Sequence, residues 1–239
     1  AIALIQQSDG KLVAAGYAFN ESSNYDFALA RYNPDGSLDT SFDGDGLLTT
    51  DFSSGDDHSF ALVLQSDGKL IVAGSSRNGI NSDFALARYN PDGSLDTGFS
   101  SDGKLTTDFS GGDEEVRALA LQTDGKIIAA GNVNVIFGGY TDFALARYNP
   151  DGSLDTSFDG DGLLTTDFSG FDDRIADLVL QPDGKLIVAG SNEDGTYANF
   201  ALARYNPDGS LDDSFGDNGL LTTDFFGNDD AVICLLYTS

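Results

Sequence analysis

The chain has 239 residues, with 39 Asp or Glu against 12 Lys or Arg, and its formal net charge is −27. Nucleic acids and anionic lipid surfaces are bound through basic patches, so this charge argues against nucleic acid as a partner. No apolar run approaches the ~18 residues that a membrane-spanning helix requires, so we expect no membrane insertion.

Two motifs each recur four times along the chain. The run Phe27–Asp39 is repeated without change from Phe84, Phe143 and Phe200, at spacings of 57 or 59 residues. A fixed period of this size is typical of repeat proteins, in which each unit buries its apolar surface against its neighbours. The second motif, Gln-x-Asp-Gly-Lys, begins at Gln7, Gln65, Gln122 and Gln181. We place the four repeats at residues 1–58, 59–115, 116–174 and 175–232.

The chain opens within a repeat, because residues 1–7 align with residues 59–65. We therefore expect an internal fragment of a longer polypeptide, with flanking repeats of that polypeptide as partners. At the other end the repeat pattern stops at residue 232. Residues 233–239 resemble the in-frame translation of a transposase adapter used in sequencing libraries, so we expect them not to be native; a divergent strand is the alternative. The only cysteine, Cys234, lies in this segment.

Each repeat contains four short apolar segments, which we predict to be strands. In the second repeat they are residues 60–65, 69–74, 84–90 and 105–109. Asp67-Gly68 between the first two predicts a hairpin turn. Asn90-Pro91-Asp92-Gly93 predicts a turn after the third. Residues 75–81 are rich in Gly, Asn and Ser and are expected to form a loop.

The predicted strands are apolar on both faces, so both faces of each sheet must be covered. This pattern predicts an all-β fold of tandem four-stranded antiparallel blades, forming a β-propeller or an open propeller fragment. A β-solenoid, with its shorter coils, and a string of sandwich domains, at ~100 residues each, fit the period less well.

The repeated motifs resemble the bacterial delta-60 repeat. The segments that carry the resemblance are Ala-Leu-Val-Leu-Gln-Ser-Asp-Gly-Lys-Leu-Ile-Val-Ala-Gly from Ala61, the run from Asp26 to Asp39, and Leu-Leu-Thr-Thr-Asp-Phe from Leu47. The family is regarded as β-propeller-like, has no assigned biochemical function, and occurs in large secreted or surface proteins. The hairpin motif also resembles, less closely, the blades of NHL-type propellers.

A cluster of acidic residues begins at the last residue of the first motif in two repeats. Carboxylates spaced by glycines around a tight loop are the ligands that Ca²⁺ prefers, although no acidic residue closes these loops at the twelfth position. The alternative is that these aspartates form turns by accepting hydrogen bonds from their own backbone. The candidate metal ligands are Asp39, Asp43, Asp45, Asp155, Asp159 and Asp161, and Ca²⁺ is the only cofactor that the sequence points to.

One arginine recurs at the same position of every repeat. An arginine in this setting commonly pairs with a carboxylate of its own or the next repeat, for example Asp39 or Asp51. We therefore predict a structural role for Arg31, Arg88, Arg147 and Arg204.

The sequence predicts no catalytic residue. His58, the only histidine, is not repeated, and we expect it in an exposed loop. Paired carboxylates such as Asp56-Asp57 and Asp172-Asp173 recur at every repeat junction, which favours a solvated turn over an acid–base pair.

Function is expected in the segments that differ between repeats, because variable loops on a rigid scaffold commonly carry binding. These segments are residues 17–25, 75–82, 132–140 and 191–198. The third is the most apolar, and its candidate ligand-contact residues are Val135, Ile136, Phe137 and Tyr140.

Together these features predict a non-enzymatic propeller module of a larger bacterial protein, located outside the cell or on its surface. Its role would be interaction or adhesion through a protein or glycan ligand. The alternative is a propeller-type hydrolase or lyase that uses carboxylates and a metal at a central channel.

Overall fold

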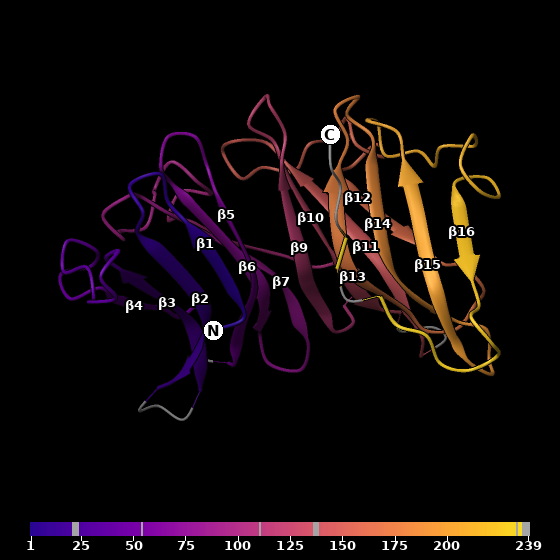
Figure 1. Ribbon diagram of the computed structural model, residues 1–239, viewed down its shortest axis with the longest axis horizontal. Helices are drawn as coiled ribbons and strands as arrows, with labels where there is room; N and C mark the ends of the chain where they lie inside the picture. Colours follow the sequence, from indigo (N-terminus) through magenta and orange to yellow (C-terminus); the bar gives the residue numbers. More distant parts are fainter. Residues whose placement is uncertain (21–23, 54, 110, 136–138, 233, 236–239) are drawn as a thin grey trace. The chain divides into compact units, whose positions relative to one another are not determined.

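The computed structural model describes residues 1–239 except 21–23, 54, 110, 136–138, 233 and 236–239. Its described residues form four antiparallel sheets of four strands each (Figure 1). The fold is therefore all-β, with tandem four-stranded blades, as the sequence predicted. Among the described residues no helix is long and apolar enough to cross a bilayer.

Each sheet is built from four consecutive strands, and neighbouring strands in the chain are neighbours in the sheet. The strands of the first two sheets are β1 (Ala3–Gln6), β2 (Leu12–Phe19), β3 (Tyr25–Tyr32), β4 (Leu47–Thr50), β5 (Asp57–Leu64), β6 (Leu70–Arg77), β7 (Ser82–Tyr89) and β8 (Lys104–Thr107). The strands of the other two are β9 (Glu114–Leu121), β10 (Ile127–Asn134), β11 (Thr141–Tyr148), β12 (Leu163–Thr166), β13 (Asp173–Leu180), β14 (Leu186–Glu193), β15 (Ala198–Tyr205) and β16 (Leu220–Thr223).

Tight turns join the first and second strands of each sheet, as Asp-Gly predicted. Gly68 has a φ of 85°, which residues with a Cβ rarely adopt, and its N–H donates to the carbonyl of Gln65. This turn aligns β5 with β6, so Leu64 pairs with Leu70. The apolar residues of both strands are thereby brought into one sheet.

The chain divides into two compact units, residues 1–108 with 113–116 and residues 109–112 with 117–239. In each unit the side chains of two sheets interlock in a core of aliphatic and aromatic residues. The first core contains Val13, Ala15, Phe27, Leu29, Phe42, Leu48, Leu62, Leu70, Val72, Ala85, Ala87 and Tyr89. The second contains Ala118, Ile128, Ala130, Phe143, Leu145, Phe158, Leu164, Ile175, Leu178, Leu186, Val188, Ala201, Ala203 and Tyr205.

Polar contacts join adjacent sheets within each unit. In the first unit the hydroxyl of Tyr89 lies 2.8 Å from Oγ1 of Thr50, and both side chains are buried. In the second unit the hydroxyl of Tyr205 lies 2.9 Å from Oγ1 of Thr166. Burial raises the pKa of both tyrosines, so they stay neutral and can donate to the threonine.

The first three strands of the second repeat are longer than the apolar runs that predicted them, whereas the fourth, β8, is shorter than the predicted run 105–109. The expected loop at 75–81 was wrong at its start, because β6 continues through Arg77 and Ser76 pairs with Asp83. Likewise β5 begins at Asp57, inside the expected turn between repeats. Both extensions consist of polar residues, so apolar periodicity could not reveal them.

Candidate functional site

The repeated arginine lies at the centre of a polar cluster within each repeat. Nε of Arg31 lies 2.7 Å from Oδ2 of Asp39, and Nζ of Lys11 lies 2.9 Å from the same oxygen. The guanidinium carbon of Arg31 lies 4.5 Å from the centroid of the Phe42 ring, a cation–π distance. The other Oδ of Asp39 accepts a hydrogen bond of 2.7 Å from Ser41 Oγ. We call this set the Arg–Asp cluster.

The same cluster recurs in the other repeats. Arg88, Arg147 and Arg204 pair with Asp96, Asp155 and Asp212, with Nε–Oδ2 distances of 2.7, 2.6 and 2.7 Å. The Lys11 ammonium, with the Ser41 hydroxyl, holds the pKa of Asp39 well below its usual range. All four arginines therefore have carboxylate partners within their own repeats, which is the geometry of a structural residue.

The arginine also connects neighbouring repeats. Nη1 of Arg31 donates to the carbonyl of Pro91 in the second repeat, and Nη1 of Arg147 donates to the carbonyl of Pro207 in the fourth. Both side chains are buried. One guanidinium thus orders the turn of its own repeat and binds the turn of the next.

The aspartates of the predicted calcium loops take part in ion pairs and hydrogen bonds of the turns that contain them. Asp39 and Asp155 are occupied by the Arg–Asp clusters. The exposed Asp45 accepts a hydrogen bond from the N–H of Leu47 through its Oδ1, at 2.9 Å. Asp161 does the same for Leu163, also at 2.9 Å. This arrangement fits the turn-forming alternative.

Asp43 and Asp159 serve the same loops through their backbone. Both have positive φ, at 50° and 49°. The N–H of Asp43 donates to the carbonyl of Asp92 at 2.8 Å, and the N–H of Asp159 donates to that of Asp208 at 2.8 Å. These contacts join one repeat to the next within each unit, and they leave the two side chains exposed.

The structure instead gathers carboxylates where the sequence predicted solvated turns. Three groups of three acidic residues lie among the described residues, each with one oxygen per residue and all three oxygens within 4.8 Å of one another. We call them the carboxylate groups. They are Asp26, Asp51 and Asp57; Asp83, Asp108 and Glu114; and Asp142, Asp167 and Asp173.

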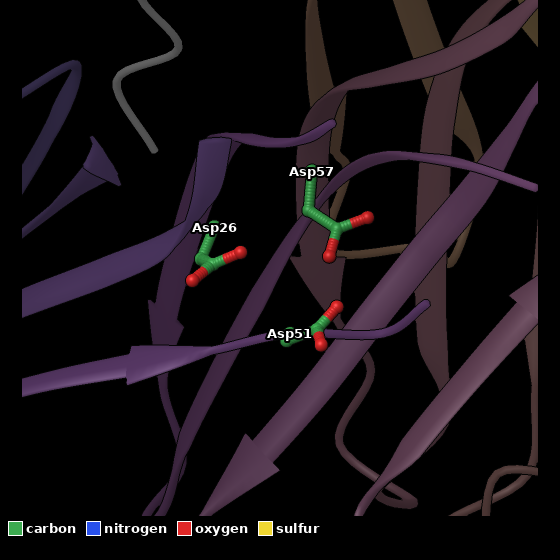
Figure 2. Close-up of side chains that lie close together, drawn as sticks. All are labelled: Asp26, Asp51 and Asp57. Atoms are coloured by element: carbon green, nitrogen blue, oxygen red, sulfur yellow. The ribbon is translucent and has the colours of Figure 1, made fainter. Parts of the chain in front are cut away.

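Strand register explains how the first carboxylate group forms. Phe27 pairs with Thr50, so Asp26 just before it lies opposite Asp51 just after β4. The connection from β4 to β5 then returns Asp57 to the same place, where the N–H of Phe52 donates to its Oδ2 at 2.7 Å. Figure 2 shows the three carboxylates converging on a common space.

Burial in this group is uneven. Asp57 is 0% exposed and Asp26 is 6% exposed, whereas Asp51 is exposed. Burial raises the pKa of Asp57 to about 6, and the charges of Asp51 and Asp26 add to this effect; the N–H of Phe52 and the hydroxyl of Ser76 oppose it. Three acidic side chains are therefore close together, and only Asp51 is open to solvent. The expectation of a solvated turn at this junction was wrong for Asp57, since it is fully buried in β5.

The third carboxylate group has the same arrangement, and Asp173 accepts one more hydrogen bond than Asp57 does in the first group. Burial raises the pKa of Asp173 and of Asp142 to about 6. Oδ2 of Asp173 accepts from the N–H of Phe168 at 2.7 Å, and its Oδ1 accepts from Nδ2 of Asn192 at 2.9 Å. In the fourth repeat Asn199 takes the place of Asp26, so that repeat has one carboxylate fewer there.

His58 is not in an exposed loop, and that expectation was wrong. It lies in β5 and is half-buried. Its ring centroid lies 4.4 Å from that of Tyr17 and 5.2 Å from that of Tyr25. The imidazole packs in an aromatic cluster, because β5 begins earlier than the apolar pattern indicated.

The segments that differ between repeats are shorter than expected, since the second and third strands extend into them. They are residues 20–24, 78–81, 135–140 and 194–197. In the third, Val135 is half-exposed and Tyr140 is 42% exposed, with its ring 5.5 Å from that of Phe171. The candidate residues Ile136 and Phe137 lie outside the described residues.

The first sheet also has a shallow hollow of about 310 Å³. Small and aliphatic residues such as Ala14, Ala28 and Leu48 form most of its lining. Among the described residues that line it there is no acidic or basic side chain.

Comparison with known proteins agrees with this architecture. A family model described as "Domain of unknown function (DUF5122) beta-propeller" matches residues 7–42, 65–99, 122–158 and 181–215. No curated protein matches the sequence.

Solved structures that match the chain include a protein of unknown function from Bacteroides caccae, with 10% identity and a TM-score of 0.47 over 86% of this chain and 56% of that one. Streptogramin B lyase has 13% identity and a TM-score of 0.43, over 88% of this chain and 57% of that one. A glycosyl hydrolase from Bacteroides ovatus has 12% identity and a TM-score of 0.40, over 92% and 68%. The chain thus spans little more than half the length of the first two.

Four matched segments cover more than half of the chain, and each contains one Arg–Asp cluster. The chain belongs to the DUF5122 β-propeller family and carries four copies of its repeat.

Proposed function

We propose that this chain is a non-enzymatic interaction module of a larger secreted or surface protein. The loops between the second and third strands contact a protein or glycan ligand. The proposal rests on the contacts that the polar residues shared by all repeats make. Arg31, Lys11 and Asp39, with their counterparts in each repeat, are occupied by contacts within and between repeats. The loops, which differ from repeat to repeat, are the surface left for recognition.

We also propose that the four repeats are delta-60 repeats and are related to the blades of NHL-type propellers, because of the repeated motifs described in the sequence analysis. The extracellular or surface location follows from that resemblance and from the acidic surface, and it is part of the proposal. A signal peptide or a surface-sorting segment in the full reading frame would support it. A cytoplasmic catalytic domain in that frame would contradict it.

The second candidate, a hydrolase or lyase, rests on the carboxylate groups, since carboxyl groups with a pKa of about 6 suit acid–base chemistry. However, equivalent carboxylate groups recur in three of the four repeats, whereas an active site needs its acid and base in a single pocket. The recurrence favours a role in building the repeats.

The proposal is tested by binding and turnover on the same preparation. The fluorescently labelled chain is applied to a glycan array and to immobilised extracellular matrix proteins. The control is a loop-exchange variant in which residues 20–24, 135–140 and 194–197 are replaced by the segment Asn78-Gly79-Ile80-Asn81. Binding by the parent that the loop-exchange variant loses supports the proposal. Binding by neither, or turnover of chromogenic glycosides by both, overturns it.

A further inference from the structure

The carboxylate group of Asp26, Asp51 and Asp57 has features that the Arg–Asp clusters and the turns do not explain. It joins β3 and β4 of the first sheet to β5 of the second sheet. In the part of the chain that the structure describes, no lysine or arginine forms an ion pair with these three side chains. Lys104 approaches the group, but its Nζ donates to the backbone carbonyl of Asp51 at 2.8 Å.

Two oxygens of this group are buried and have no hydrogen-bond partner among the described residues. They are Oδ1 of Asp26 and Oδ1 of Asp57, and the two residues are 6% and 0% exposed. The second oxygen of each is satisfied, by Nδ2 of Asn20 at 2.8 Å and by the N–H of Phe52 at 2.7 Å. The hydroxyl of Ser76, the cross-strand neighbour of Asp57, lies close enough to lower the pKa of Asp57, but the two groups do not form a hydrogen bond of normal geometry. Buried carboxylate oxygens are normally paired or coordinate a metal, so these two indicate an unfilled requirement for a positive charge.

We propose that Asp26, Asp51 and Asp57 bind a divalent cation, and that Ca²⁺ is the ion that fits the group. The second group, Asp83, Asp108 and Glu114, and the third, Asp142, Asp167 and Asp173, are the equivalent sites of the following repeats. This site is distinct from the Asp43 and Asp45 loop, and it does not depend on what the variable loops bind.

The chemistry of the site follows from its donors. All of them are oxygens, which hard cations prefer, and there is no thiolate or imidazole in the set. Two ligands on opposite sides of a Ca²⁺ ion are separated by about 4.8 Å, twice the calcium–oxygen distance of ~2.4 Å. The three oxygens of the group lie within 4.8 Å of one another, so one ion can contact an oxygen from each residue. Exposed Asp51 leaves the remaining coordination positions to water.

The position of the site determines what the cation would do. Asn20 holds Asp26 from the loop after β2, and the N–H of Tyr25 donates to Oδ1 of Asp56 at 3.0 Å. A cation on the carboxylate group therefore fixes the junction between two sheets together with the base of one variable loop. In the second group Asn78 of the next variable loop holds Asp83 in the same way.

Calorimetric titration of CaCl₂ into the chelator-treated full chain tests the proposal. NaCl at matched ionic strength gives the reference, because the net charge of −27 responds to any salt. We expect saturable calcium binding, reduced by one equivalent in Asp26→Asn. We expect it to be lost in the triple variant Asp26→Asn, Asp83→Asn, Asp142→Asn. Asn199 occupies the same position naturally, so the substitution is compatible with the fold.

Two controls separate the site from general electrostatics. Asp213→Asn removes one exposed carboxylate elsewhere, and calcium binding should not change. Asp45→Asn with Asp161→Asn tests the turn loops, and binding should again persist. Asp51→Asn, at the exposed member of the group, should match Asp26→Asn. Absence of binding beyond the NaCl reference, or binding that survives the triple variant, would overturn the proposal.

Discussion

Nε of Arg31 lies 2.7 Å from Oδ2 of Asp39, with both side chains buried and the same pair present in all four repeats. The two residues are eight positions apart, on either side of the Asn-Pro-Asp-Gly turn. The N–H of Asp39 also donates to the carbonyl of Arg31 at 2.9 Å. The pair therefore closes the turn after the third strand, and Nη1 of Arg31 extends the contact to Pro91 of the next repeat.

Replacing this arginine should destabilise the chain. Breaking a buried ion pair typically costs ~3–5 kcal/mol, and Lys11 still contacts Asp39, so we expect a loss of about 3 kcal/mol for Arg31→Met. In a chain of this size that lowers the melting temperature by roughly 6–12 °C. Differential scanning calorimetry measures the change. Arg174→Met removes the same charge from an exposed side chain and should change the melting temperature by no more than ~2 °C. Equal effects of the two substitutions would mean that charge alone is responsible.

The contact between Tyr89 and Thr50 should contribute measurably to the packing of the first two sheets. Tyr89→Phe removes the hydroxyl and leaves Oγ1 of Thr50 buried without that donor, so we expect a loss of about 1 kcal/mol. A double-mutant cycle with Thr50→Val isolates the interaction by urea unfolding. The double variant should lose less than the sum of the two single variants. Strict additivity would show that the hydroxyl contributes nothing to the junction.

Much of this fold could be predicted from the sequence, for a physical reason. Strands and turns depend on local backbone preference and on burial, which apolar runs and Asp-Gly pairs indicate. Each of these patterns occurs four times at a fixed period, which makes the prediction more secure. The strand pairing of Leu64 with Leu70 follows directly from the turn between them. The ion pair of the repeated arginine could also be predicted, because a cation in an acidic chain has carboxylates available for pairing.

The carboxylate groups could not be predicted in the same way. Asp26, Asp51 and Asp57 come from three separate segments and meet only through strand register and the return of the chain to the next sheet. Asp57 precedes the apolar run of its strand, so the sequence pattern predicts a turn at this residue. One feature of the sequence pointed to the group: an acidic residue stands at the Asp51 and Asp57 positions in all four repeats, and at the Asp26 position in three.

The raised pKa values predict an unusual dependence of stability on pH. Burial raises the pKa of Asp57, Asp142 and Asp173 to about 6, above the ordinary value of 3.8. At pH 8 the folded chain must hold these carboxylates ionised. As the pH falls through 6 the folded state takes up protons before the unfolded state does, and the free energy of unfolding rises. In chelated buffer the melting temperature should therefore increase from pH 8 to pH 5.

Below pH 4 the trend should reverse. The carboxyl groups of Asp39, Asp96, Asp155 and Asp212 have lowered pKa values, so the stability that they contribute is lost as they take up protons. Asp57→Asn should reduce the rise between pH 8 and pH 5, because Asp142 and Asp173 still contribute to it, whereas Asp213→Asn should leave the rise unchanged. A melting temperature that falls steadily from pH 8 to pH 5 would be inconsistent with buried, ionised carboxylates.

Our central claim is that the residues shared by the repeats stabilise the fold, whereas the variable loops do not and are left for binding. The melting temperature of the loop-exchange variant, in which the segment Asn78-Gly79-Ile80-Asn81 replaces the other three loops, tests it most directly. The exchange leaves every Arg–Asp cluster, both apolar cores and all three carboxylate groups in place. Calorimetry should therefore give a melting temperature within about 3 °C of the parent chain, because surface substitutions away from such features cost little. A fall as large as that expected for Arg31→Met would contradict the account, since the loops would then be part of the scaffold.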